Sequence, residues 1–270
     1  MDSIDYFIKF AGAHGAKMSA DEGHDNPKNS VQLSGASLEA HLKSMIRTAA
    51  GVEKNSKLPF DWMGNAKNPP DLILKDHEAW EVKKLENSGS ELQLNSSPPK
   101  QQLGCTDEMI TKSCRAIRQG TWSTDLIYAV GACNDDELRS LFFCYGDVLC
   151  ADQDVYRKTW QSVKGVILTS SDDHSETKEL GRINDVDPLG RASLRIRGMW
   201  LLQSPFSAFA TSLDADTSGR QYLLARLERF SSHQDVLQGV YPEITVQRLK
   251  VDDPDNPAQD IDVVLLSSKL

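Results

Sequence analysis

Two carboxylates and a lysine stand close together in one short stretch of the chain. Pro70 precedes Asp71, and Glu81, Val82 and Lys83 follow ten residues later. If this stretch forms a β-hairpin, Asp71 faces Glu81 across the strands, and Lys83 shares the face of Glu81. Converging carboxylates repel one another, and a hard divalent cation relieves that repulsion. The predicted ligands of Mg²⁺ are therefore Asp71, Glu81 and the backbone carbonyl of Val82.

A lysine beside such an ion can orient an attacking water and offset negative charge on phosphorus in the transition state. The trio thus predicts metal-assisted phosphodiester hydrolysis, with Asp71, Glu81 and Lys83 as catalytic residues. A structural interpretation stays open, in which Glu81 and Lys83 form a solvated strand face and Asp71 begins a strand. Upstream, Glu39 could be an accessory catalytic carboxylate, or it could simply pair with Lys43 one helical turn later.

The hairpin itself is predicted from local sequence. Apolar runs at 71–75 and 79–85 flank a polar turn at Asp76 and His77. The preceding helix is predicted over Ser37–Ala50, where apolar residues recur at helical spacing and Gly51 ends the pattern. This helix would bring Glu39 toward the hairpin.

The next hundred residues alternate in the same way. Helical spacing predicts helices over 107–119 and 155–164, and apolar runs predict strands over 125–131 and 138–145. The expected fold class is α/β, a mixed β-sheet flanked by helices, with a core of the αβββαβ type.

The remainder of the chain predicts a C-terminal α+β elaboration. The expected elements are an acidic excursion over 168–190, strands at 193–197 and 199–202, a helix over 219–230, a strand over 244–251 and an edge strand over 261–266. We expect one domain over residues 1–270, with a catalytic core at about 35–165 and an elaboration at about 166–270 for DNA recognition or dimerisation.

Composition limits the function classes. The net charge of −9 weakens a nucleic-acid hypothesis without excluding it, because residues 121–190 carry a net −7 and residues 191–250 a net +3. Nucleotide-binding glycine loops, the G-x-S-x-G motif and the H-E-x-x-H motif are absent, and the five cysteines show no C-x-x-C spacing. No apolar run approaches the ~20 residues needed to cross a bilayer, so a cytoplasmic protein is expected.

The P-D…E-x-K pattern in this order of elements resembles the PD-(D/E)xK nuclease superfamily. The amino-acid sequence around these motifs resembles type II restriction endonucleases of the NgoPII family more closely still. The stretches that carry the resemblance span residues 35–147, and they are Gly35–Lys43, Pro70–Lys75, Glu81–Lys84, Leu94–Lys100, Asp125–Gly131 and Tyr145–Asp147.

This resemblance implies a restriction-endonuclease-like fold and a Mg²⁺-dependent homodimer in the cytoplasm of a prokaryote. It also implies cleavage of double-stranded DNA at a short GC-rich palindrome, GGCC or a GG(N)CC-type variant, to leave 5′-phosphate ends. A cognate DNA methyltransferase would be the functional partner. Carried over by motif, Asp71 and Glu81 hold the metal, Lys83 positions the water and Glu39 is accessory.

Candidate DNA contacts are less sharply defined. Lys100 and Gln101 follow the rigid Pro98-Pro99 loop near the hairpin, and Arg195 and Arg197 alternate on a predicted strand as arginines that read guanine do. A solvated strand face explains the two arginines equally well. Two other functions stay open: a structure- or mismatch-directed DNA repair nuclease of the same superfamily, and a non-catalytic DNA-binding protein on this fold.

Overall fold

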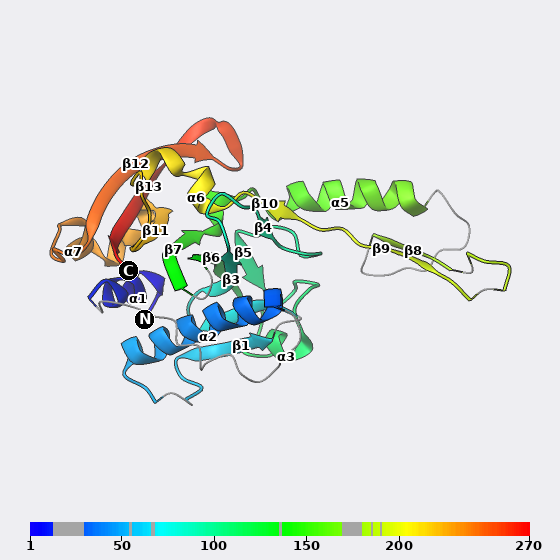
Figure 1. Cartoon of the computed structure of the whole chain (residues 1–270), viewed down its shortest axis with the longest axis horizontal. Helices are drawn as coiled ribbons and strands as arrows, with labels where there is room; N and C mark the ends of the chain where they lie inside the picture. The colour runs from blue at the N-terminus through cyan, green and yellow to red at the C-terminus, as the bar shows by residue number, and fades with distance from the viewer. Residues whose placement is uncertain are drawn as a thin grey trace.

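A long mixed sheet forms the centre of the molecule (Figure 1). The computed structural model describes residues 1–12, 30–53, 56–65, 68–134, 137–168, 180–184, 186–189 and 191–270. The sheet has nine strands in the order β1-β2-β3-β6-β7-β11-β13-β12, with β5 paired to β6. The pairs β3–β6 and β7–β11 are parallel, and the other neighbours are antiparallel. This confirms the predicted α/β class with a mixed sheet.

The strands that carry the predicted chemistry lie toward one edge of this sheet. The bounds are β1 Phe60–Asn65, β2 Asn68–Leu74, β3 Ala79–Leu85, β5 Gln102–Gly104, β6 Ser123–Asn134, β7 Glu137–Tyr145, β11 Arg220–Arg226, β12 Thr245–Asp253 and β13 Asn256–Lys269. Two small ladders stand apart, one between β4 (Leu92–Gln93) and β10 (Leu201–Leu202) and one between β8 (Gly181–Ile183) and β9 (Leu194–Ile196).

Helices cover both faces of the sheet. The longer ones are α1 Ser3–Gly12, α2 Ser30–Ala50 and α5 Gln153–Leu168, and the short ones are α3 Lys112–Arg115, α4 Gly146–Leu149, α6 Pro205–Ala208, α7 Gln234–Leu237, η2 Ala210–Ser212 and η3 Leu227–Ser232. None of the helices in the described ranges is long and apolar enough to span a membrane.

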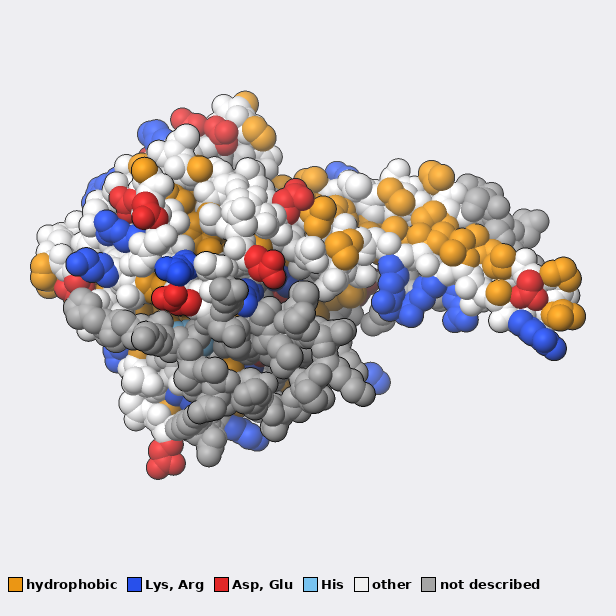
Figure 2. All heavy atoms as spheres, in the orientation of Figure 1, with side chains coloured by type: hydrophobic (Ala, Val, Ile, Leu, Met, Phe, Trp, Pro, Cys, Tyr) orange, Lys and Arg blue, Asp and Glu red, His pale blue; other side chains and the backbone are white. Residues whose placement is uncertain are grey.

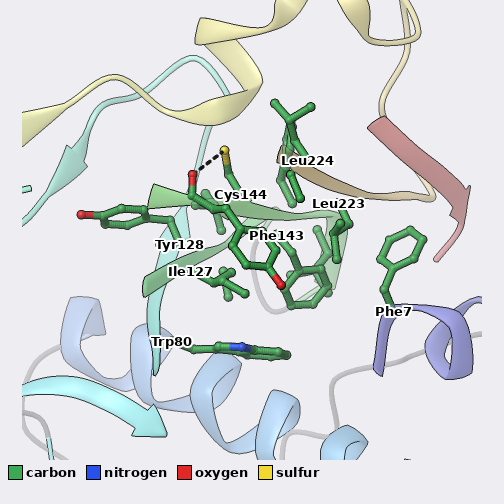
Figure 3. Close-up of a cluster of buried hydrophobic side chains, with 14 of the residues drawn as sticks. Phe7, Trp80, Ile127, Tyr128, Phe143, Cys144, Leu223 and Leu224 are labelled. Carbon is green, nitrogen blue, oxygen red and sulfur yellow. Dashed lines mark hydrogen bonds between the residues drawn. The ribbon is translucent and has the colours of Figure 1, made fainter. Parts of the chain in front are cut away.

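Adjacent aromatic residues on β7 show how the two faces are filled. Phe143 packs against Trp80 and, from α1, against Phe7, with ring centroids 5.0 and 6.5 Å apart (Figure 3). Phe142 points to the other face and packs against Phe206 of α6, with ring centroids 5.3 Å apart. Because successive side chains of a strand alternate, one apolar strand anchors helices on both sides.

The helix α2 lies close against the same face as α1. Leu38, Leu42 and Ile46 are fully buried and recur every four residues, as the predicted apolar stripe requires. A β-carbon at Gly131 would lie 2.7 Å from a methyl group of Leu38, so glycine at that position of β6 permits the approach. The neighbouring Glu39 is thereby held next to the sheet.

An arm projects from the body and is formed by α5 and the β8–β9 hairpin (Figure 1). Trp160 of α5 stacks on Trp200, with centroids 6.2 Å apart, and a β-carbon at Gly198 would lie 2.5 Å from the Trp160 ring. These contacts fix the root of the arm. From its root to its tip the arm exposes much apolar surface, since eight large hydrophobic residues are more than two-fifths exposed: Val155, Val163, Val166, Val186, Leu189, Leu194, Met199 and Leu201.

Several predicted elements need correction. The predicted helix over 219–230 is wrong: it is the strand β11 followed by the 3₁₀ turns of η3, because its apolar residues are buried on both faces between β7 and β13. The predicted edge strand over 261–266 belongs to the much longer β13, which lies between β11 and β12. The predicted helix over 107–119 shortens to α3, and α2 begins before Ser37.

The C-terminal elaboration is continuous with the core rather than separate from it. Its strands β11, β12 and β13 extend the same sheet through the parallel pairing of β11 with β7. Of the predicted excursion over 168–190, residues 169–179, 185 and 190 lie outside the described residues, and β8 falls within the rest.

Candidate active site

The predicted hairpin is present, and it brings the two motif halves together. In the antiparallel ladder of β2 and β3, Leu72 pairs with Trp80 and Ile73 with Ala79, so Asp71 comes opposite Glu81 when the register continues by one residue. The backbone N–H of Val82 donates a hydrogen bond to Oδ2 of Asp71 at 2.7 Å. This contact fixes the Asp71 carboxylate against the E-x-K strand.

Glu81 and Lys83 share a face of β3, as strand alternation predicts. The Nζ of Lys83 lies 2.9 Å from Oε1 of Glu81, and both side chains are less than one-fifth exposed. Trp80, on the opposite face, is fully buried, and Val82 packs against the same core. The core therefore holds one face of β3 rigidly while the other presents the charged pair.

The neighbouring strand β1 passes close to the proline-aspartate step. A β-carbon at Gly64 would lie 2.2 Å from the carbonyl oxygen of Pro70 and 3.1 Å from that of Asp71. Any other residue at position 64 would push β1 away from β2. Glycine here therefore keeps the strand that carries Asp71 in place.

Electrostatics single out Asp71 within the site. Burial first, and then the nearby negative charges of Glu81 and Glu39, raise the pKa of Asp71 well above its usual value. The charge of Lys83 and the hydrogen bond from the Val82 N–H lower the pKa of Asp71, but by less than burial and the neighbouring carboxylates raise it. The site thus holds more negative charge than its own groups neutralise, which is the condition that a divalent cation with oxygen ligands satisfies.

Lys83 keeps its charge in this setting. Burial alone would favour the neutral amine, but the charges of Glu81 and Asp71 outweigh it and raise the pKa of Lys83 above its ordinary value. A lysine that stays protonated at neutral pH acts as a hydrogen-bond donor and a positive charge. In the metal-free protein, its geometry and charge suit it to placing a water or a phosphate oxygen rather than to accepting a proton.

Glu39 forms the helical pair that its spacing allowed, and it also lies near the hairpin. Its carboxylate pairs with Lys43 on the next turn of α2. It is also close enough to Asp71 to raise the pKa of that residue. The pairing with Lys43 therefore does not separate Glu39 from the carboxylate cluster of the hairpin.

A small cavity of about 20 Å³ adjoins Glu81, room for roughly one water. Lys100 lines it from the interior: its side chain is 6% exposed, and its ammonium pairs with Asp107. The hydroxyl of Tyr128, also lining the cavity, accepts a hydrogen bond from the Lys100 backbone N–H at 2.8 Å. A contact between the Lys100 ammonium and DNA would require its ion pair with Asp107 to open. No pattern in the sequence indicated that Tyr128 would line this cavity.

The other predicted DNA contacts lie elsewhere. The Nε2 of Gln101 donates hydrogen bonds to the carbonyl of Cys150 and to Oδ2 of Asp255, both at 3.0 Å. Arg195 lies on β9, and Arg197 directly follows that strand; both are exposed on the arm, away from the hairpin (Figure 1). The structure thus brings together the predicted catalytic residues and separates them from the candidate arginines.

One further group of possible metal ligands was not found from the sequence. Within the described part of the chain, Asp2, Asp5 and His233 place their ligand atoms within 4.8 Å of one another. The Nε2 of His233 lies 3.2 Å from Asp5 and 3.4 Å from Asp2. These pairs join α1 to the segment between η3 and α7, which is a structural role.

Comparison with known proteins agrees with the motif and its geometry. The family model described as NgoPII restriction endonuclease matches residues 11–251. The chain belongs to the NgoPII restriction endonuclease family. The type II restriction enzyme NgoPII of Neisseria gonorrhoeae is 32% identical over 251 residues, which cover 88% of this chain and 90% of that enzyme. No solved structure matches the chain.

Family membership confirms the resemblance stated from the sequence and extends it. The family match runs to residue 251, beyond the stretches at 35–147 that suggested it. It therefore includes the arm, β11 and most of β12, and it ends before β13. As a member of this family the chain is a type II restriction endonuclease, a site-specific deoxyribonuclease.

Proposed function

We propose that this restriction endonuclease hydrolyses both strands of duplex DNA at GGCC or a GG(N)CC-type palindrome, with Mg²⁺ as cofactor and 5′-phosphate ends as products. The observation that carries the proposal is the buried, charge-unbalanced cluster around Asp71, joined to Glu81 and Lys83 in one ladder. Carboxylates in this excess fit a hard divalent ion. The length of the family match supports the restriction function.

Each residue of the cluster has a proposed role. Asp71, Glu81 and the Val82 carbonyl would hold the ion, which supplies Lewis-acid activation of a water and of the phosphate. Lys83 would donate to the attacking water or to a phosphate oxygen and offset charge as the bond to phosphorus forms. Glu39 of α2 would add a third negative charge near the ion.

The assembly is proposed on the same basis. A palindromic site has two-fold symmetry, which a homodimer matches. Residues 1–270 would form one domain whose C-terminal part serves recognition or dimerisation. A methyltransferase that protects the same site and a prokaryotic cytoplasm complete the proposed context.

Digestion of a DNA of known sequence tests the proposal. In Mg²⁺ the wild-type protein should produce discrete fragments whose mapped ends share one palindrome, and in EDTA it should produce none. Lys83→Ala should lower the rate of cleavage by about 10²–10³, the cost of removing one transition-state donor. Lys84→Ala is the matched control, because strand alternation turns Lys84 to the other face of β3.

Three results would contradict the proposal. Uniform smearing would show nonspecific cleavage. Nicking confined to junctions or mispairs would instead assign the chain to DNA repair. Equal loss of activity in Lys83→Ala and Lys84→Ala would remove Lys83 from the reaction.

A further inference from the structure

The β8–β9 hairpin of the arm places arginines directly opposite each other. In its register Arg182 pairs with Arg195, and the side chains of such a pair emerge on the same face of the ladder. Arg197 follows two residues after Arg195, in step with the alternation of that face. Like charges in direct cross-strand opposition are unfavourable on their own. We call Arg182, Arg195 and Arg197 the arginine face.

The arginine face points away from the helix of the arm. On the opposite face of the hairpin, Gly181 pairs with Ile196, and a β-carbon at Gly181 would lie 2.6 Å from Ile167 of α5. This apolar contact packs one face of the hairpin against α5. The arginines therefore occupy the side that α5 leaves uncovered.

The described residues of the arm carry more basic than acidic side chains, although the full stretch 153–201 is nearly balanced, with eight Lys or Arg and seven Asp or Glu. The described residues between 153 and 201 include seven Lys or Arg and two Asp or Glu, against a net charge of −9 for the whole chain. Figure 2 shows the basic side chains gathered along one side of the arm and the hydrophobic ones along another. The acidic residues at 172–179 lie outside the described residues.

The root of the arm is bonded to the wall of the active site. The N–H of Leu94 donates to the carbonyl of Trp200 at 3.0 Å, and the N–H of Trp200 donates to the carbonyl of Asn95 at 2.8 Å. The hydroxyl of Ser96 donates to the carbonyl of Gly198 at 3.3 Å. Leu94 also lines the cavity beside Glu81, so the strand leading from the arginine face runs directly to the catalytic wall.

We infer that the arginine face binds the phosphate backbone of the duplex that the active site cleaves, on DNA flanking the scissile bond. Guanidinium groups match phosphate oxygens in geometry and charge, and a phosphate between Arg182 and Arg195 would contact both side chains at once. An arginine that pairs within the protein can exchange that partner for a phosphate. The inference rests on the proposed function and assigns the face to backbone positioning rather than to base reading.

The test compares DNA affinity over a range of salt concentrations. Duplex binding in Ca²⁺ is measured from 50 to 300 mM KCl for the wild type and for the triple variant Arg182→Gln, Arg195→Gln, Arg197→Gln. Each phosphate contact contributes about 0.9 to the slope of log K against log salt, so the slope should fall by about 2–3. Affinity should fall by about 10–100-fold for specific and unrelated duplexes alike.

Two control variants distinguish charge at this face from folding and from general charge. The corresponding triple Lys variant keeps the positive charge and should recover most of the slope. Arg139→Gln removes an exposed arginine that pairs with Glu137 on β7, and it should leave the slope unchanged. Sedimentation of each variant reports the oligomeric state.

Wild-type slope and affinity in the triple Gln variant would overturn the inference. So would an unchanged slope with an altered oligomeric state, which would assign the arm to contact with a second copy of the chain. A wild-type protein that neither binds nor cuts duplex DNA would overturn the proposed function itself. Loss of binding in the Gln and Lys variants alike would show a role other than charge.

Discussion

The proposed chemistry depends on the unfavourable electrostatic environment of the Asp71 carboxylate. This carboxylate is buried beside Glu81 and Glu39 while it accepts a hydrogen bond from Val82, and the result is a raised pKa. A raised pKa means that ionising Asp71 costs more in the folded chain than in the unfolded one. The ionised group therefore destabilises the metal-free fold above its folded pKa and does so no longer at acid pH.

Asp71→Asn should accordingly stabilise the protein while it abolishes cleavage. At pH 8 in EDTA we expect the free energy of unfolding to rise by about 1–2 kcal/mol, a typical gain when a functional residue is neutralised. The gain should shrink as pH falls through the raised folded pKa toward the unfolded pKa of about 4, below which the wild-type carboxyl is protonated in both states. Thermal unfolding between pH 4 and 8 measures it.

The matched control for this prediction is Asp187→Asn. Backbone N–H groups, that of Leu189 first, lower the pKa of this exposed carboxyl, so its loss should not stabilise the fold. A pH-independent gain in Asp71→Asn, or an equal gain in Asp187→Asn, would contradict the electrostatic account of Asp71.

Residue types and spacing were sufficient to predict that Asp71, Glu81 and Lys83 come together, because a hairpin sets which residues face each other and residues two apart on a strand share a face. The same reasoning could not place Lys100. Its pair with Asp107 and its burial depend on how a loop folds over β6, and a charged residue after a Pro-Pro step gives no sign of that.

At the scale of elements, α2 places the Glu39–Lys43 pair near Asp71 from outside the hairpin. The contact depends on Gly131, which lets Leu38 and its helix approach the sheet. If Glu39 belongs to the metal site, Glu39→Gln should raise the Mg²⁺ concentration for half-maximal cleavage by about tenfold, as loss of an outer-shell partner does. Metal titration of the cleavage rate measures this.

Lys43→Gln separates the two interpretations of Glu39. It breaks the same helical pair, worth about 0.5 kcal/mol, but leaves the carboxylate in the field of Asp71. We expect it to leave the Mg²⁺ requirement unchanged or lower. Wild-type Mg²⁺ requirements in both variants would restrict Glu39 to its pair with Lys43.

Most of the longer elements were predicted from the sequence, including the buried strands β6 and β7, whereas β11 was not. The hairpin of β2 and β3 forms where its apolar runs and polar turn predicted it, and α5 and β12 fall close to their predicted ranges. In β11, Tyr222 to Ala225 are all buried, so no period of two survives and the arginines around them imitate the polar side of a helix. Residues 220–226 form a strand because they lie in the interior of the sheet between β7 and β13, and not because of their local hydrophobic pattern.

At the scale of the whole molecule, a protein with a net charge of −9 must bind DNA, which is also negatively charged. A network on the body offsets some of its own acids: Arg229 pairs with Asp125 and Asp147 and lies 4.6 Å from the centre of the Tyr145 ring. The active site remains negative, and its carboxylates should repel the scissile phosphate until a divalent ion intervenes. Neither this distribution nor the projecting arm could be predicted, because both depend on tertiary packing.

The affinity of the metal-free and Ca²⁺-loaded protein for a duplex that it cleaves tests the central claim most directly. Ca²⁺ should raise the affinity of the wild-type protein by at least about tenfold relative to EDTA. Asp71→Asn should bind more tightly than wild type in EDTA and respond little to Ca²⁺. A wild-type affinity that Ca²⁺ leaves unchanged, or an Asp71→Asn variant that responds as the wild type does, would contradict a metal site at Asp71 and Glu81.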